Sequence, residues 1–238
     1  MACVLRNRAA KRLPPDEGMQ GMFDSASARR MMVDGQVLTA DVHNPDLLAA
    51  MLTIPRERFV PPSLAQQAYI DSDIDIAPGR VLLKPMVFAK LIEAADVRPS
   101  DRVLDVGCGL GYSSAVLSRL AGSVVALEED AGLANQAKAA LAATGASGVT
   151  VVTGPLTAGW PAGAPYDFIL LNGTTEIVPD GFAGQLKPDG RLACIFGRAH
   201  ASKAIIYRVA EGRLVGRPAF DAAAPVLPGF VAPPAFVF

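Results

Sequence analysis

The sequence predicts an α/β fold built on a doubly wound, mostly parallel sheet, and three observations support this fold class. From residue 102 onward, short apolar strands alternate with helical segments, the pattern of parallel strands joined by crossover helices. The strand at 102–106 leads directly into a glycine-rich turn and a helix, as in open sheets that bind nucleotides. The composition, 51% hydrophobic and 19% charged over 238 residues, is that of a folded domain with a sizeable core.

The N-terminal segment is expected to form a helical cap preceded by a loose arm. Residues 1–24 are basic and contain prolines, without the apolar stretch of a secretory signal. Either Ser25 or Ser27 is placed to cap a helix that runs through Val37, because a serine side chain can accept a hydrogen bond from the free N–H groups of a first helical turn.

A second cap helix is predicted from Asn44 and Pro45, since asparagine is a favoured N-cap and proline fits the first helical position. Pro55 ends this helix. Residues 56–83 are interpreted as an ordered linker that crosses the face of a domain, and Pro85 begins the first helix of the core.

The core is expected to contain seven strands, of which the last two form a hairpin. Glu211-Gly212 separates two alternating segments, which favours a hairpin and therefore an antiparallel edge to the sheet. The chain is predicted to be a single domain at 25–238, with a cap and linker at 25–83 and a core at 84–238. The expected core elements are strands 102–106, 124–128, 149–153, 167–171 and 191–196, helices at about 112–121 and 130–143, and hairpin strands 204–209 and 213–218.

Composition and charge exclude several classes of partner. The 22 basic and 23 acidic residues give a net charge of −1, so the chain has no overall attraction to nucleic acid or to an anionic membrane. No stretch approaches the roughly 20 apolar residues of a membrane span. Three scattered cysteines indicate a reduced, cytoplasmic protein, and the sequence leaves open a monomer or a homodimer. The alternating run Asp71, Asp73 and Asp75 has no further ligands beside it, so we expect no metal site there.

A glycine-rich turn and the acid before it form the candidate cofactor loop. Gly107, Gly109 and Gly111 follow a strand and begin a helix, where free N–H groups and close backbone approach suit a nucleotide-type cofactor. A dinucleotide enzyme would carry G-x-G-x-x-G, but Tyr112 occupies the third glycine position. Asp105 adds a carboxylate that suits the α-amino group of an amino acid and would repel a pyrophosphate. The loop therefore favours a sulfonium amino-acid nucleotide.

Glu128 is the second part of the predicted cofactor site. It ends the next strand, 21 residues after Gly107, where an acid can accept hydrogen bonds from ribose hydroxyls. A glycine turn without a ligand and a nicotinamide enzyme are the alternatives at this point. Residues of the loop and its neighbours that are also assigned to the cofactor are Cys108, Tyr112, Glu129, Pro155, Leu156 and Asn172.

Longer runs give the chain a resemblance to a known family. They include Ile54-Pro55-Arg56-Glu57-Arg58-Phe59-Val60-Pro61, Lys84-Pro85-Met86-Val87-Phe88-Ala89, Gly159-Trp160-Pro161 and Leu186-Lys187-Pro188. With these runs, the chain from about Ala28 to Arg191 resembles the protein-L-isoaspartate O-methyltransferase family. The resemblance implies a class I methyltransferase fold and S-adenosylmethionine as methyl donor, with S-adenosylhomocysteine as product. It also implies methyl esterification of L-isoaspartyl carboxylates in damaged proteins.

The chain departs from that family in the segment before the first core helix. The family typically reads G-Q-T-I-S-Q-P there, and this chain reads Gly79-Arg80-Val81-Leu82-Leu83-Lys84-Pro85. Val81 and Leu83 replace the hydroxyl residues that the resemblance places at the reacting carboxylate. Arg80 and Lys84 offer positive charges that an anionic acceptor could pair with, or they are solvated side chains at a helix start. These four residues are the substrate-site candidates.

Two other loops also depart from the family. Gly154-Pro155-Leu156 replaces a G-D-G run that carries an acid near adenine, and the loop at 172–176 replaces an alanine-rich one. A carboxylate acceptor is ionised at neutral pH and needs no general base, so no catalytic residue is assigned. Three alternatives stay open: isoaspartyl methylation, methylation of a different protein, peptide or small-molecule acceptor, and cofactor binding in a regulatory protein without catalysis.

Overall fold

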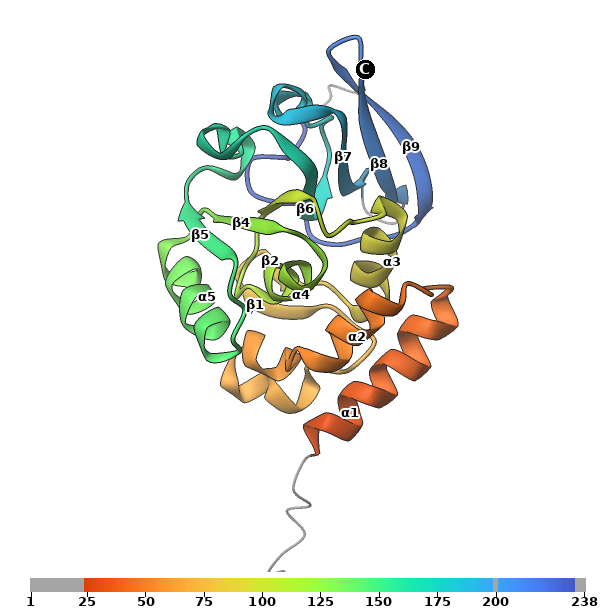
Figure 1. Ribbon diagram of the computed structural model, residues 1–238, viewed down its shortest axis with the longest axis vertical. Coiled ribbons are helices and arrows are strands. Elements are labelled where there is room, and N and C mark those ends of the chain that lie inside the picture. The colour runs from red at the N-terminus through yellow and green to blue at the C-terminus, as the bar shows by residue number, and fades with distance from the viewer. Residues whose placement is uncertain (1–23, 199–200, 234–238) are drawn as a thin grey trace, which may run out of the picture.

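A seven-stranded sheet forms the centre of the molecule (Figure 1). The computed structural model describes residues 24–198 and 201–233, so all but the last residue of the predicted arm at 1–24 lies outside the described residues. The strand order is β5-β4-β3-β6-β7-β8-β9, with β3 to β7 parallel and β8 and β9 antiparallel, which confirms the predicted fold class. The strands are β3 Arg102–Val106, β4 Ser123–Glu128, β5 Val149–Thr153, β6 Tyr166–Thr175, β7 Leu186–Phe196, β8 Lys203–Ala210 and β9 Arg213–Asp221.

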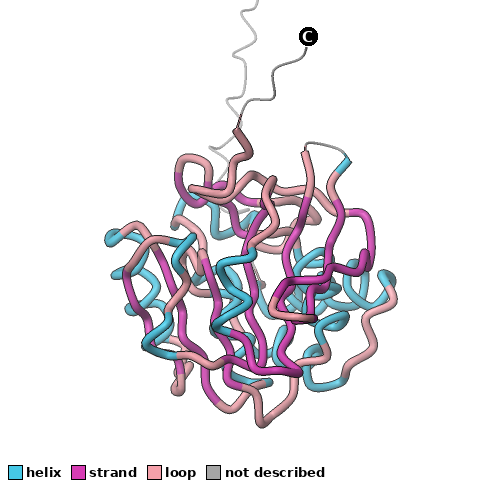
Figure 2. Tube along the Cα trace, turned by 90° about the horizontal axis from the view of Figure 1, so that it is seen from above, coloured by secondary structure: helices cyan, strands magenta, loops and turns pink. Residues whose placement is uncertain are grey.

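Side chains alternate across the sheet and divide the core in two. In β3, Val103 belongs to the cluster on one face, and Leu104 and Val106 belong to the cluster on the other. The first face is covered by helices, and the second is covered by short 3-10 turns and the C-terminal segment 226–230. Figure 2 shows the strands running between these layers. The helices are α3 Pro85–Ala95, α4 Tyr112–Leu120 and α5 Ala131–Ala143, and the turns are Leu156–Ala158, Pro161–Gly163 and Asp180–Gln185.

The first cap helix, α1 (Ser25–Met32), begins earlier than either predicted cap, Ser25 or Ser27, would allow. The Asp24 carboxylate accepts hydrogen bonds from the N–H groups of Ala26 and Ser27 at 3.0 and 3.2 Å, so the expectation of a serine cap is wrong. Aspartate is as good an N-cap as serine, and Asp24 stands immediately before the first helical residue. The helix continues as a π turn at Val33–Val37 and a 3-10 turn at Leu38–Ala40.

The second cap helix, α2 (Pro45–Thr53), starts at the predicted Asn44-Pro45 pair. The Asn44 side chain accepts hydrogen bonds from the N–H groups of Asp46 and Leu47. In Figure 1, α1 and α2 lie together below the sheet. The predicted helical cap is therefore present.

The segment interpreted as a linker contains a two-stranded hairpin. Strands β1 (Ile74–Ala77) and β2 (Arg80–Leu82) pair antiparallel, with a bulge between Asp75 and Ala77. Pro78 and Gly79 form its turn, and Gly79 has a φ of 68°. This hairpin was not predicted from the sequence, although two alternating segments around Pro-Gly are a hairpin signal. Two 3-10 turns, Arg56–Phe59 and Pro62–Gln67, precede it.

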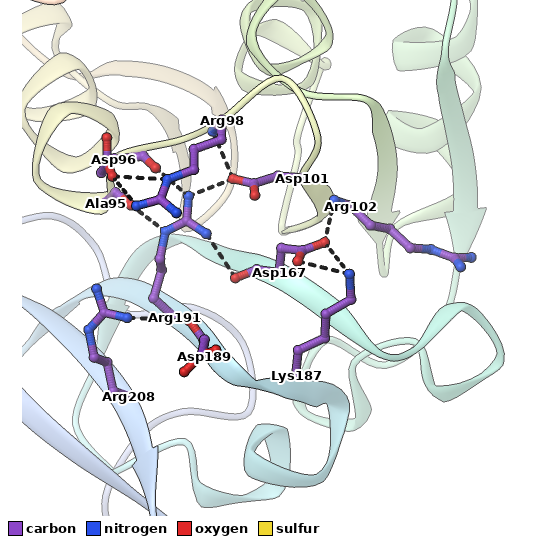
Figure 3. Close-up of polar contacts among 10 residues, drawn as sticks. All are labelled: Ala95, Asp96, Arg98, Asp101, Arg102, Asp167, Lys187, Asp189, Arg191 and Arg208. Atoms are coloured by element: carbon purple, nitrogen blue, oxygen red, sulfur yellow. Dashed lines mark hydrogen bonds and ion pairs between the residues drawn. The ribbon is translucent and has the colours of Figure 1, made fainter.

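Arg191 joins several elements at the amino end of the sheet (Figure 3). Its side chain is 8% exposed and donates to the carbonyls of Ala95, Asp96 and Asp167. It also pairs with the Asp101 carboxylate at 2.6 Å. Because these acceptors belong to the end of α3, the start of β6 and the residue before β3, one guanidinium fixes α3 against the strands.

Replacing Arg191 by methionine should destabilise the fold strongly. Arg191→Met leaves buried Asp101 without its charge partner, and breaking a buried pair in this way costs about 3–5 kcal/mol. Urea unfolding measures the loss. The matched control is Arg98→Met, because the Arg98–Asp96 pair is exposed and should contribute less than about 1 kcal/mol. Equal losses in the two variants would contradict the role given to Arg191.

Candidate cofactor site

The turn after β3 has the backbone conformation that the glycine pattern predicts. Gly107, Gly109 and Gly111 have φ values of 74°, 57° and 96°, which side-chain-bearing residues rarely adopt. The N–H groups of Gly107 and Cys108 both donate to the carbonyl of Leu127, at 2.8 and 3.2 Å. The loop is therefore tied to the end of β4, and Gly111 is the N-cap of α4.

Asp105 lies under this loop with no exposed surface. The hydroxyls of Ser113 and Ser114 donate to one carboxylate oxygen at 2.6 and 2.5 Å, and the Asn172 amide donates to the other. Burial raises the pKa of Asp105 to about 6, although the hydrogen bonds from the two serine hydroxyls act in the opposite direction and lower it. Asp105 and Asn172, both predicted as cofactor residues, are therefore in direct contact.

Glu128 ends β4 and is also fully buried. It accepts hydrogen bonds from the N–H groups of Gly109, Glu129 and Asp130, at 2.8, 2.9 and 3.2 Å. Both terminal nitrogens of Arg80 donate to it as well, at 2.6 and 2.7 Å, in a bidentate ion pair. Five donors on two carboxylate oxygens, which together offer about four lone-pair sites, leave Glu128 saturated.

The other residues assigned to the cofactor fall into different surroundings. Leu156 is buried, and its N–H donates to the Glu129 carboxylate at 3.3 Å, while Pro155 is exposed. Burial raises the pKa of the Cys108 thiol well above its usual value, so Cys108 is a neutral packing residue. Tyr112 packs in the core, with its ring 4.7 Å from the Arg56 guanidinium, and does not meet Asp105 or Glu128.

The four substrate-site candidates are also separated. Leu83 is 3% exposed within the core, and Val81 packs against the same cluster. Lys84 is half-buried at the start of α3, where its N–H donates to the Asp73 carboxylate at 2.7 Å. Arg80 is the one of the four whose side chain hydrogen-bonds to a predicted cofactor residue, Glu128.

Four residues at the site were not predicted from the sequence. Ser113 and Ser114 could have been found, because the first turn of a helix after such a loop faces back toward Asp105. Ile76 and Leu227 gave no signal. A side-chain carbon of Ile76 lies 2.5 Å from where a Cβ would stand on Gly109. A side-chain carbon of Leu227 lies 3.1 Å from where a Cβ would stand on Gly107. These contacts come from segments distant in sequence.

Beside Arg80 is a cavity of about 410 Å³. It is lined by Ala77, Pro78, Arg80, Glu129, Asp130, Leu133 and Pro228. Within residues 24–198 and 201–233, no group of three or more His, Cys, Asp or Glu residues is placed to bind a metal ion. In the same ranges, no helix has the length and apolar composition needed to cross a membrane.

The carboxyl edge of the parallel sheet thus carries a carboxylate suited to an α-amino group, a glycine-rich turn, and an acid suited to ribose hydroxyls. Together these features define a cofactor-binding domain of the class I methyltransferase type. The sequence profile of the family described as Protein-L-isoaspartate(D-aspartate) O-methyltransferase matches residues 30–218. The chain belongs to this protein-L-isoaspartate O-methyltransferase family.

Relatives named protein-L-isoaspartate O-methyltransferase cover most of the chain. The protein from Methylorubrum extorquens is 42% identical over 73% of this chain and 76% of its own length. The protein from Pelotomaculum thermopropionicum is 37% identical over 86% of this chain and 87% of its own. The family resemblance given by the sequence motifs is thereby confirmed.

Solved structures confirm the fold. A structure named protein-L-isoaspartate O-methyltransferase has a TM-score of 0.71 at 24% identity, covering 86% of this chain and 66% of its own. A Plasmodium falciparum protein of the beta-aspartate methyltransferase type, solved with S-adenosyl-L-homocysteine, has a TM-score of 0.72 at 16% identity. It covers 84% of this chain, and this chain covers 97% of it.

Removing one hydroxyl from Asp105 should raise its pKa further. In Ser114→Ala the ionised carboxylate loses a donor, so its proton is held more tightly and the pKa moves above about 6. An NMR titration of the side-chain carboxyl carbon measures this shift. Ser118→Ala is the control, because the Ser118 hydroxyl on the same helix donates to the Ala115 carbonyl instead. An unchanged or lower pKa in Ser114→Ala would overturn the assignment of these hydroxyls.

Proposed function

We propose that this protein is an S-adenosylmethionine-dependent methyltransferase that esterifies L-isoaspartyl carboxylates in proteins. The observation that carries the proposal is the meeting of Asp105, the glycine loop and Glu128 at one sheet edge, in a chain that matches the family over residues 30–218. The names of the relatives, and S-adenosyl-L-homocysteine in one structural neighbour, support it. Protein repair in the cytoplasm is part of the same proposal.

The residues of the loop fit this cofactor. Asp105 would hold the α-amino group, Glu128 would accept from the ribose hydroxyls, and the backbone at Leu156 would lie by the base. The space above Gly107 is covered by the ends of the Leu227 and Arg80 side chains, 3.1 and 3.2 Å from where a Cβ would stand. Side-chain ends move by rotation, whereas a backbone cover would not. The site can therefore admit the cofactor without refolding.

The chemistry asks the chain mainly to position two reactants. S-adenosylmethionine supplies a methyl group on a sulfonium, which a carboxylate oxygen can displace in line. The acceptor carboxylate is already ionised at neutral pH, so the protein needs no proton acceptor for it. Correct alignment of the acceptor oxygen is then the main contribution of the residues near the loop.

A changed acceptor is the second candidate, and Val81 favours it. Its apolar side chain cannot supply a hydroxyl group to orient a carboxylate, and it makes the surroundings less suited to an unpaired charge. Leu83, the other departure from the family, is buried in the core. A protein, peptide or small molecule with a less polar nucleophile would meet this surface more readily.

Methylation of an isoaspartyl peptide tests the proposal directly. With labelled S-adenosylmethionine, we expect transfer to a peptide containing isoaspartate and none to the same peptide with aspartate. Asp105→Asn should abolish transfer, because an amide cannot form a charge-assisted bond with an ammonium group. Cofactor binding by calorimetry without transfer would identify the changed acceptor instead. Absence of binding at millimolar cofactor would contradict both isoaspartyl methylation and methylation of a changed acceptor.

Restoring a hydroxyl at residue 81 should raise isoaspartyl activity. Val81→Thr has nearly the same shape and supplies a hydrogen bond to an acceptor oxygen, and a positioning contact of this kind can change the rate by up to about 10²-fold. The kcat with the isoaspartyl peptide measures the gain. Val81→Ala is the control for bulk, and it should not gain activity. Leu83 is left unchanged because it is buried in the core. A kcat unaffected by threonine would count against a latent carboxylate site.

A further inference from the structure

The ribose end of the site is closed by an ion pair within the chain. Glu128 is the acid that the proposed function assigns to the ribose, and Arg80 holds both of its oxygens at 2.6 and 2.7 Å. The Arg80 side chain is 7% exposed, so this pair is removed from solvent. A second cover comes from Leu227, which lies against the same glycine as Arg80.

We propose that Arg80 is a gate residue: it competes with the ribose of the cofactor for Glu128, and the cofactor binds only when the guanidinium leaves. The inference rests on the proposed function, because it takes Glu128 as the ribose acid. It adds a specificity-determining role for Arg80, which from the sequence is either a partner of an anionic acceptor or a solvated side chain.

The competition follows from the number of donors at Glu128. Three of its five donors are the backbone N–H groups of Gly109, Glu129 and Asp130. The glycine loop fixes the first of these groups, and the chain directly after β4 fixes the other two. The two Arg80 nitrogens are the donors that a side-chain rotation can withdraw. Ribose hydroxyls can therefore reach the carboxylate only in the positions that Arg80 occupies.

The position of Arg80 is set by the hairpin. It is the first residue of β2, directly after the Pro78-Gly79 turn, and its register with Ala77 follows a bulge. The cavity of about 410 Å³ beside the pair is lined by Arg80 itself, Pro78 and Glu129. This cavity gives the displaced Arg80 guanidinium a place to move into.

The closed arrangement is stable without ligand because a buried carboxylate needs a partner. Opening the pair leaves one buried charge uncompensated unless another donor replaces Arg80. The apparent affinity for the cofactor is then the intrinsic affinity multiplied by the fraction of molecules in which Arg80 is already displaced. A neutral side chain of similar length at residue 80 should therefore increase affinity.

Calorimetric titration of the full-length protein with S-adenosylhomocysteine tests the gate. We expect Arg80→Gln to bind at least about tenfold more tightly than wild type, because the closed state loses its ion pair. Glu128 keeps its three backbone donors in this variant. Arg98→Gln is the matched control, since it removes an arginine from an exposed pair and should leave the affinity unchanged.

A pair of nucleosides tests whether the gain acts through the ribose. Arg80→Gln should improve binding of adenosine and should improve binding of 2′,3′-dideoxyadenosine much less, because the second ligand has no hydroxyls to offer Glu128. Adding Glu128→Gln to Arg80→Gln should abolish the gain for adenosine. Equal gains for the two nucleosides would overturn the assignment of Arg80 to the ribose position.

Arg80→Lys keeps the test open if the glutamine variant does not fold. Lysine retains the charge but cannot hold both oxygens as a planar guanidinium does, so its gain in affinity should lie between wild type and Arg80→Gln. A folded variant that binds S-adenosylhomocysteine no more tightly than wild type overturns the gate and leaves the proposed function standing. Failure of wild type and both variants to bind at millimolar ligand overturns the proposed function and the gate together.

Discussion

The carboxylate of Glu128 is the point on which the organisation of the site depends. It is a buried charge at the end of a central strand, and such a charge persists in a protein only when it is paired and hydrogen-bonded. The backbone of the glycine loop, the start of α5 and the β1–β2 hairpin each supply donors to it. The loop, the next helix and the hairpin therefore share one anchor at the carboxyl edge of the sheet.

Two buried arginines serve the two edges of the sheet differently. Arg191, at the amino edge, donates to three backbone carbonyls and pairs with Asp101, so four acceptors hold it in place. Arg80, at the carboxyl edge, donates to Glu128 alone among the described residues, and a cavity lies beside it. Arg191, with four acceptors, is therefore a fixed structural contact, whereas the single partner of Arg80 makes its contact one that a ligand can replace.

Local signals in the sequence were enough for the core of the fold and for half of the site. The alternation of strands and helices, the glycine positions and the acid at the end of β4 predict β3 to β5, α4 and α5 to within one residue, because strand burial and turn conformation act over short distances. β6 ends four residues later and β7 begins five residues earlier than predicted. The hairpin around Pro78-Gly79 is not predicted from the sequence, since the aspartates before it and within its first strand make the segment resemble a solvated loop.

The closure of the site could not be predicted in the same way. Arg80 and Glu128 are 48 residues apart, and an arginine in isolation is expected to be solvated, so only the folded hairpin shows that they pair. Leu227 reaches Gly107 because residues 225–227 bond to Thr174, in the part of β6 that extends beyond its pairing with β3. Contacts of this kind depend on how distant segments cross, which neither periodicity nor composition records.

A crystal structure of the protein with S-adenosylhomocysteine is the most direct test of this account. The account predicts that Glu128 accepts hydrogen bonds from the ribose hydroxyls, that it keeps the N–H groups of Gly109 and Glu129, and that the Arg80 guanidinium has left it. A complex in which the Arg80–Glu128 pair is intact and the ribose is held elsewhere would contradict it.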